Sequence, residues 1–366
     1  MGLLDYYKQF EGMSEEEVNA GLRAEAEERR RKALTRVETL DLSQTTWPEL
    51  PHPRIVNAIT FVARRGLHRY PHVRGTELRE ELAASLGVEP ARLILGNGAA
   101  ELLSSATRAL IEPGQRLLTS WPSYPLYPIM ARRAHGQAVP VTGGIDALLE
   151  AAQDPSTRVI ALANPNDPTG ELISGGELQR LLGGLPETVA VLLDESLVEF
   201  VDAQPVDTSL KLLDAYPRLL VFRSFSKAWG LAGLRVGYAI GSPRSQELLA
   251  ELEPDLGVSE VSQAGALEAL RTCSNLLEKH VEGVREERPR LIAALRERGF
   301  DVAESQANFV WAAHPTLSAG AFASHLEQAG ILVTEGDALD EPRYVRIAIR
   351  KSAATARLLA AIDNTI

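Results

Sequence analysis

The stretch Ser-Phe-Ser-Lys-Ala-Trp-Gly-Leu-Ala-Gly-Leu-Arg-Val-Gly-Tyr fills residues 224–238 and directly follows the apolar run 219–223. It places Lys227 just after the carboxyl end of a predicted buried strand. Two serines precede the lysine, and a glycine-rich turn follows it. Burying a lysine amine in such a place costs free energy unless the amine is covalently bound or paired with an opposite charge. A Schiff base to an aldehyde would provide that engagement, so Lys227 is predicted to be a reactive amine. An ordinary surface lysine in a loop is the alternative for any lone lysine.

Short β-rich runs alternate with helical patterns from about residue 50 to about residue 250. This alternation predicts crossover units and a mostly parallel sheet. The expected strands are 92–95, 116–119, 158–163, 189–194, 219–223 and 235–240. Helical stretches between them include 99–111 and 176–182.

The pattern changes beyond about residue 255, where it predicts one long helix over 261–298, strands around 307–312 and 344–349, and a last helix. A chain of 366 residues is long enough for two packed cores, since single cores stop growing at roughly 250–300 residues. We therefore predict an α/β fold, in which a three-layer large domain with a mostly parallel sheet is joined to a smaller α+β domain. The expected parts are an N-terminal helical arm joining the small domain (1–48), the large domain (49–255) and the small C-terminal domain (256–366). Within the arm, a capping box at Ser14 predicts a helix over 14–34.

The bulk properties restrict the partners and the compartment. The formal net charge of −11, from 49 acidic and 38 basic residues, argues against nucleic acid as the main partner. The single cysteine, Cys273, rules out an internal disulfide framework and fits a reducing compartment. The sequence has neither a secretory signal pattern nor an apolar run of about 18 residues that would span a bilayer. A cytoplasmic protein without membrane contact is expected.

Three further predicted strands end in polar groups, at the edge where open parallel sheets bind ligands. Asp194 ends the apolar run 189–193, where a buried carboxylate could pair with a protonated ring nitrogen or could simply cap the next segment. The run 158–163 enters Asn-Pro-Asn-Asp-Pro-Thr-Gly (164–170), which alone is a turn signal. The run 92–95 enters Gly-Asn-Gly-Ala-Ala-Glu (96–101), a glycine turn whose free helix amides suit a phosphate, although the motif by itself is weak.

Together these features resemble the fold type I pyridoxal phosphate (PLP) enzymes, specifically the class I/II aminotransferases, and most closely their histidinol-phosphate aminotransferase-like branch. The resemblance covers nearly the whole chain from about residue 40, and the segment 224–238 is its most specific part. It implies pyridoxal 5'-phosphate as cofactor and a homodimer whose active sites are shared across the interface. It also implies a small-molecule amino donor and a keto-acid acceptor.

Residue by residue, the resemblance makes Lys227 the Schiff-base lysine and Asp194 the partner of the pyridine nitrogen. Tyr124 is similar to the residue stacked on the ring face, and Tyr70 to the tyrosine that reaches the phosphate of the other subunit. Arg346 matches the arginine that clamps a substrate carboxylate, for which a bidentate fork is suited. The remaining implied residues are the phosphate ligands Ser224, Arg235 and the amides of Ala99 and Ala100, and Asn308 on the small-domain strand that lines the pocket.

Three positions depart from the family's pattern. Asp167 stands where the family has an asparagine that donates to the phenolic oxygen of the cofactor, and Leu197 where it usually has a tyrosine as second donor. An ionised carboxylate cannot donate and would repel a phenolate. We hypothesise either a protonated Asp167 or a ring oxygen that keeps its proton; replacement of the donor by Asn166 or by rotated backbone is the alternative. Trp47, in a segment where the family has Asn-Glu-Asn-Pro, is expected to reshape the substrate side.

The implied activity is transamination between an amino acid or amino phosphate and a keto acid. Lys227, freed by the substrate amine, would act as general base and acid while the cofactor accepts electrons. A PLP-dependent decarboxylase or lyase shares the early steps, and a non-catalytic PLP-binding protein is a further alternative. The seven histidines show no two-histidine helix motif, so no metal is expected.

Overall fold

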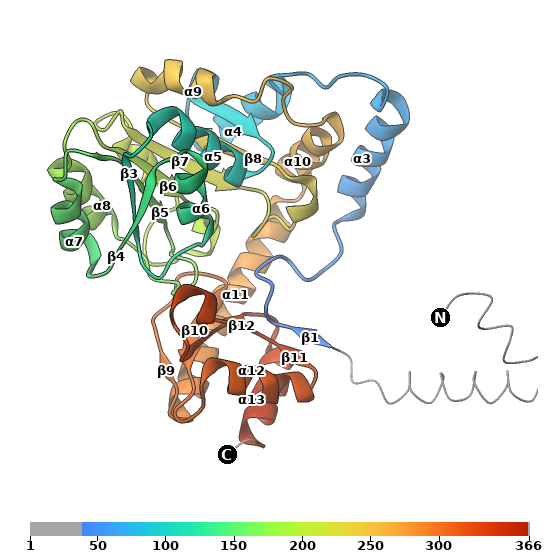
Figure 1. Ribbon diagram of the computed structural model, residues 1–366. Helices are drawn as coiled ribbons and strands as arrows, with labels where there is room; N and C mark the ends of the chain where they lie inside the picture. Colours follow the sequence, from blue (N-terminus) through green and yellow to red (C-terminus); the bar gives the residue numbers. More distant parts are fainter. Residues whose placement is uncertain (1–38, 365–366) are drawn as a thin grey trace, which may run out of the picture. The chain divides into compact units, whose positions relative to one another are not determined.

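The computed structural model describes residues 39–364 of the chain (Figure 1). The helix predicted over 14–34 lies outside the described residues, as does most of the predicted N-terminal arm. Within the described part, no helix is both long and apolar enough to cross a membrane.

Within the described residues, seven strands form the larger sheet, in the order β2-β8-β7-β6-β5-β3-β4. Neighbours from β7 to β4 pair in parallel, and β8 runs antiparallel to both β2 and β7. The sheet is therefore mostly parallel, as predicted. Its strands are β2 (Leu93–Gly96), β3 (Arg116–Ser120), β4 (Gln137–Val141), β5 (Thr157–Ala163), β6 (Ala190–Asp194), β7 (Leu219–Ser224) and β8 (Gly237–Ile240).

Two strands of this sheet differ from the prediction. β4 is absent from the predicted strands because it is an edge strand with no fully buried residue and a proline at its fourth position. The strand predicted over 235–240 begins only at Gly237, because Arg235 adopts a left-handed backbone conformation with φ 52° and ψ 58° that ends the preceding turn.

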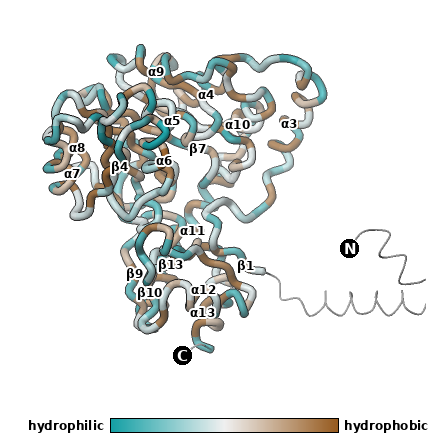
Figure 2. The backbone as a smooth tube through the Cα atoms, viewed as in Figure 1, coloured by the Kyte–Doolittle hydropathy of each residue, from teal (hydrophilic) through white to brown (hydrophobic). Residues whose placement is uncertain are grey.

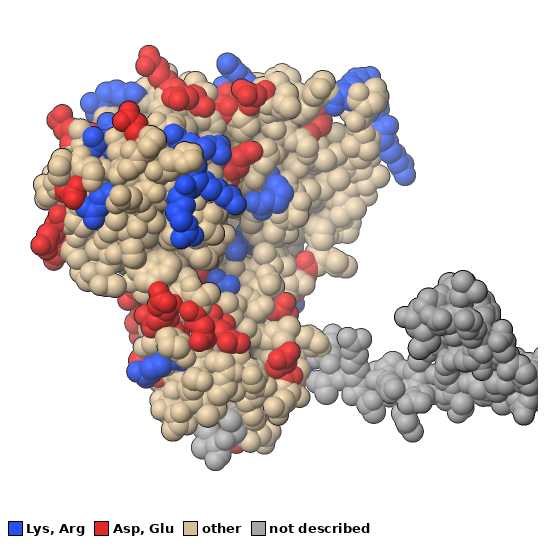
Figure 3. Space-filling view, viewed as in Figure 1, with Lys and Arg blue, Asp and Glu red and all other residues tan. Residues whose placement is uncertain are grey.

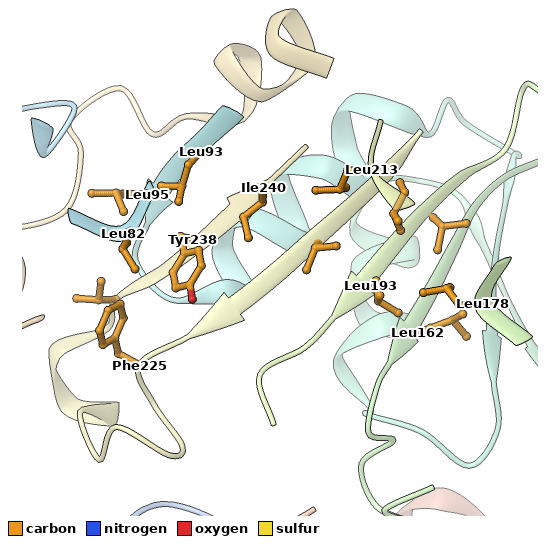
Figure 4. Packing of buried hydrophobic residues seen from close by; sticks show 14 of the residues in the cluster. Leu82, Leu93, Leu95, Leu162, Leu178, Leu193, Leu213, Phe225, Tyr238 and Ile240 are labelled. Carbon is orange, nitrogen blue, oxygen red and sulfur yellow. The ribbon is translucent and has the colours of Figure 1, made fainter. Parts of the chain in front are cut away.

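Helices cover both faces of the sheet, which gives the three predicted layers. Consecutive side chains of a strand point to opposite faces, so Leu192 and Leu193 of β6 lie in two different buried clusters. Leu193 packs with Leu162 and Leu178 (Figure 4). The helices are amphipathic, and the tube of Figure 2 changes between hydrophobic and hydrophilic residues along them. They are α4 (Thr76–Leu86), α5 (Ala99–Leu110), α6 (Leu126–Arg133), α7 (Gly144–Ala152), α8 (Gly175–Gly184) and α9 (Gln246–Leu252).

The C-terminal part contains a second, antiparallel sheet in the order β12-β13-β10-β9. Both strands predicted there exist, as β10 and β13, and so does the last helix, α13. The elements are β9 (Asp301–Val302), β10 (Phe309–Ala313), α12 (Ala319–Gln328), β12 (Thr334–Glu335), β13 (Tyr344–Ala348) and α13 (Ser352–Asp363), with the short strands β1 (Leu40–Asp41) and β11 (Ile331–Leu332) besides.

The long helix predicted over 261–298 is two helices, α10 (Glu260–Thr272) and α11 (Ser274–Glu297). Cys273 separates them, because its ψ of 13° is not helical and it caps both. α10 packs against α3 (Pro53–Gly66) and α4, and its Ala266 belongs to the same buried cluster as Leu82. The division of the chain at residues 48 and 255 stays a prediction.

Candidate active site

A cavity of about 200 Å³ lies at the carboxyl ends of β5, β6 and β7, next to the start of α5. Four chain segments far apart in the sequence meet there, because β7 and β8 pair Ser224 with Gly237 and β2 and β8 pair Gly96 with Gly237. The structure brings eight of the predicted site residues to its wall: Ala99, Ala100, Tyr124, Asp167, Asp194, Ser224, Lys227 and Arg235.

Lys227 is held by the loop that follows β7. Phe225 is fully buried, and its carbonyl accepts a hydrogen bond from the amide of Leu231 at 2.9 Å, which closes the loop. The Lys227 amine donates to Oγ1 of Thr45 at 2.6 Å. Burial lowers the pKa of Lys227, and the nearby carboxylate of Asp167 opposes that shift. The lysine is therefore a partly desolvated amine that loses its proton more easily than an exposed one.

Asp194 ends β6 at the floor of the cavity. Burial raises the pKa of this carboxyl, while hydrogen bonds to its charged form from the amide of Ser196 and the hydroxyl of Tyr127 act in the other direction. The two donors lie 3.0 Å and 3.2 Å from Asp194 oxygens. A buried carboxylate fixed in this way is suited to accept a hydrogen bond from a protonated ring nitrogen.

The start of α5 and Arg235 form a site suited to a phosphate. A Cβ added to Gly98, at φ 86°, would lie 2.2 Å from Nη2 of Arg235, and one added to Gly237 would lie 2.3 Å from the Ala99 nitrogen. Glycine at both positions therefore lets the guanidinium and the helix terminus approach each other. The amides at a helix start and an arginine are the donors that bind phosphate in proteins.

Aromatic and hydroxyl side chains complete the cavity. Tyr124 lies edge-on to Tyr127, with ring centroids 5.8 Å apart. Burial raises the pKa of the Tyr124 hydroxyl, with a further contribution from Asp194, so this hydroxyl keeps its proton. Nη1 of Arg235 donates to Oγ of Ser226 at 3.2 Å. An amine, a buried carboxylate, an aromatic wall and a phosphate cradle thus surround one space, and these residues fit the cofactor expected from the resemblance.

Asp167 lies on the cavity wall, where its Oδ1 accepts a hydrogen bond from Nη1 of Arg346 at 2.5 Å. Asn166, the alternative donor, is engaged within the chain. Its Nδ2 donates to the carbonyl of Pro122 and to Oγ1 of Thr169, both at 2.9 Å, so both N–H groups are used.

The other predicted site residues lie outside this wall. Trp47 stacks on His280, with ring centroids 3.9 Å apart, and packs against Gly230. Asn308 is buried and its Nδ2 donates to the Thr45 carbonyl at 2.8 Å. Tyr70 is 83% exposed and lines a separate hollow. The predicted roles of these residues stay predictions.

Sequence reasoning missed four residues that take part in the site: Thr45, Tyr127, Ser196 and Ser226. Ser226 had a signal, since it belongs to the same segment as Lys227. Tyr127 follows Tyr124 by three residues, which places both on one helical face only if a helix is assumed there. Thr45 had no local signal, because it comes from a loop 182 residues before Lys227.

The family model described as aminotransferase class I and II matches residues 37–362. The chain belongs to this family. It is similar to an aromatic amino acid aminotransferase of Streptomyces coelicolor, with 37% identity over 300 residues that cover 80% of this chain and 82% of the relative. Its identity to histidinol-phosphate aminotransferase 2 of Methylococcus capsulatus is 34% over 325 residues, which cover 86% of each.

A solved structure agrees with the assignment of this chain to the class I and II aminotransferases. A histidinol-phosphate aminotransferase from Sinorhizobium meliloti in complex with pyridoxal-5'-phosphate superposes with a TM-score of 0.80 and 26% identity, over 90% of this chain and 92% of that chain. The predicted α/β fold is thus confirmed as the PLP fold type I architecture. The cofactor of this aminotransferase is pyridoxal phosphate and its activity is transamination, which favours the first of the three functions predicted from the sequence.

Proposed function

We propose that Lys227 holds the cofactor and performs the proton transfers of transamination in this aminotransferase. The observation that supports this most strongly is the meeting of Lys227, Asp194 and the α5 terminus with Arg235 on one cavity. Each offers a group that a different part of the cofactor would need. Bound pyridoxal phosphate supplies an electron sink that makes the substrate Cα proton acidic.

The roles of the chain's own residues follow from their surroundings. Lys227 has a pKa lowered by burial, so its free amine would be able to take the proton from the substrate carbon and to give it up again as a general acid. Asp194 would hold the ring nitrogen, and Tyr124 would pack on the ring. Ser224, Arg235 and the amides of Ala99 and Ala100 would hold the phosphate. Ser226 would orient Arg235 through the 3.2 Å hydrogen bond between them.

We further propose a donor of the kind named for the relatives, an aromatic amino acid or an amino phosphate such as histidinol phosphate, with a keto acid as acceptor. Trp47 and Asn308 would influence the donor indirectly: Asn308 fixes the loop that carries Thr45. Arg346 would act at the substrate end, as predicted from the sequence.

We propose that the active protein is a cytoplasmic homodimer in which Tyr70 reaches the partner's site. Tyr70, Leu67 and Leu256 are large exposed side chains that line one hollow. Exposed apolar side chains that gather in this way are typical of an interaction surface.

Absorbance spectroscopy tests the proposed reaction. The purified protein with pyridoxal phosphate should show the absorbance of lysine-bound cofactor, which one donor converts to the amine form and a keto acid restores. Aromatic amino acids and histidinol phosphate are the first donors to test. Lys227→Ala should abolish the conversion, whereas Lys211→Ala, on an exposed lysine paired with Asp207, should leave it intact. Release of carbon dioxide or ammonia instead would contradict transamination.

A further inference from the structure

Tyr127 is a buried phenol that joins α6 to the carboxylate at the end of β6. Its side chain is fully buried and belongs to the same hydrophobic cluster as Leu103 and Met130. The hydroxyl donates to Oδ2 of Asp194 at 3.2 Å and has no second hydrogen-bond partner among residues 39–364. Burial and the Asp194 carboxylate both raise the pKa of Tyr127, so the hydroxyl keeps its proton. Tyr127 is therefore a permanent hydrogen-bond donor to Asp194.

The two oxygens of the Asp194 carboxylate are held in different ways. Oδ1 accepts a hydrogen bond from the amide of Ser196 at 3.0 Å, a contact that the chain makes locally, two residues further on. Within the described part of the chain, Oδ2 accepts only from Tyr127, which lies 67 residues earlier in the sequence. Tyr127 thus fixes the rotation of the carboxylate group. Each oxygen has a second lone pair, so a donor on a ligand can still be accepted.

The same hydrogen bond affects the charge of Asp194. Burial raises the pKa of this carboxyl, and the hydrogen bonds from Ser196 and Tyr127 to its charged form act in the other direction. Without the Tyr127 hydroxyl, burial would be less opposed and the neutral carboxyl would be favoured. A proton shared between a carboxylate and a ring nitrogen would then move toward the carboxylate, because the carboxylate would have become the stronger base.

Tyr127 also contacts Tyr124, the residue proposed to pack on the face of the ring. Its amide donates to the Tyr124 carbonyl at 3.2 Å, and the two ring centroids lie 5.8 Å apart. One residue therefore touches both groups that would contact the ring of the cofactor. Phenylalanine at position 127 would keep the ring contacts and remove only the hydroxyl, so the effect of packing can be separated from the effect of the hydrogen bond.

We propose that Tyr127 is a positioning residue that orients Asp194 and keeps it ionised, so that Asp194 can hold the ring nitrogen of the cofactor in its protonated form. This inference rests on the proposed function and adds a residue to it. Its consequence is that the hydroxyl of Tyr127 acts on the cofactor through the ring nitrogen alone, although it lies behind Asp194 in the buried cluster.

Equilibrium binding of two ligands to the full-length protein tests this inference. The ligands are pyridoxal phosphate and its analogue in which a C–H group replaces the ring nitrogen. Removing a hydrogen bond to a charged group should make Tyr127→Phe bind pyridoxal phosphate about tenfold more weakly, and the analogue by less than about twofold. A matched control is Tyr344→Phe, which removes a hydroxyl that donates to Asp301 at 2.7 Å in the small sheet and should leave both affinities unchanged.

The ring nitrogen itself gives a second readout. With ¹⁵N in the ring of the bound cofactor, the nitrogen resonance of the wild type should lie at the position of a protonated ring, and in Tyr127→Phe it should move toward the position of an unprotonated one. An effect of Tyr127 on packing alone would not produce this change.

Equal weakening of both ligands in Tyr127→Phe would overturn the inference, as would an unchanged affinity for pyridoxal phosphate or an unmoved nitrogen resonance. The binding comparison does not need the lysine, so it can be repeated in the Lys227→Ala background. A loss confined to pyridoxal phosphate there, together with a wild type that shows no donor-driven absorbance change, would contradict the proposed function and support the role of Tyr127.

Discussion

Thr45 is the nearest hydrogen-bond partner of Lys227, and Asn308 in turn fixes the Thr45 backbone. The hydroxyl accepts from the charged amine, and such a bond favours the charged form. Removing it in Thr45→Val should lower the pKa of Lys227 further and reduce kcat by about tenfold, while Thr45→Ser should retain both. The rate of trinitrophenylation of Lys227 against pH, in protein freed of cofactor, measures the pKa directly. Superimposable pH profiles for the threonine and valine proteins would show that the contact has no part in positioning the amine.

The residue pair Asp167–Arg346 shows what a sequence can and cannot predict at this scale. Asp167 was recognisable as a departure, because it lies in a short motif with an expected asparagine. Its partner was not recognisable, because Arg346 lies 179 residues away and on the other sheet. The pairing depends on how β13 meets the turn after β5, which only the folded chain defines. The present partners of Asn166 could not be predicted either, since Ser123, Pro122 and Thr169 come together around its amide group only in the folded chain.

At the scale of elements, a buried charge cluster joins the end of β7 to the segment that follows β6. Arg223 donates to Oε2 of Glu195 from Nε at 3.0 Å and from Nη2 at 2.7 Å. Glu199, in the 3-10 segment η2 (Val198–Phe200) that follows β6, lies close enough to influence both. Two carboxylates thus share one arginine, so the second is poorly compensated.

Burial raises the pKa of Glu199 from 4.5 to about 7, with Arg223 acting in the other direction. The folded protein therefore binds a proton that the unfolded chain has released between these values, and stability falls as the pH rises from about 4.5 to about 7. The loss attributable to this group is at most about 3 kcal/mol. Glu199→Gln should remove it, which urea unfolding at pH 5 and pH 8 would measure. An equal pH dependence in the variant and the wild type would exclude Glu199 as its source.

The elements that the sequence predicted well are those with strong apolar patterns. β5, β6 and β7 are almost entirely buried and appear within a residue of their expected bounds. β4 was missed because an edge strand lacks that pattern. The break at Cys273 was missed because both flanking segments are good helix formers, and only the different packing of α10 and α11 separates them.

At the scale of the molecule, the sheet order explains why one cavity holds most of the predicted residues. The parallel strands end at the same edge, so groups that follow β5, β6 and β7 meet there, and β8 brings Arg235 back beside the start of α5. The positions of residues from outside the large sheet, such as Trp47 and Asn308, relative to the cavity were harder to predict from the sequence. The surface seen in Figure 3 carries interspersed acidic and basic side chains, with a group of acidic ones over the small-sheet part. This distribution agrees with the acidic net charge.

The central claim is that Lys227 holds the cofactor. It is tested most directly by reducing the bond between lysine and cofactor, which makes that bond irreversible. The holoenzyme would be reduced with sodium borohydride, digested and analysed by mass spectrometry. We expect the cofactor mass on a single peptide that contains Lys227, and none on exposed lysines such as Lys211 and Lys351. Cofactor attached to another lysine, or no attachment in a protein that still binds pyridoxal phosphate, would contradict the account.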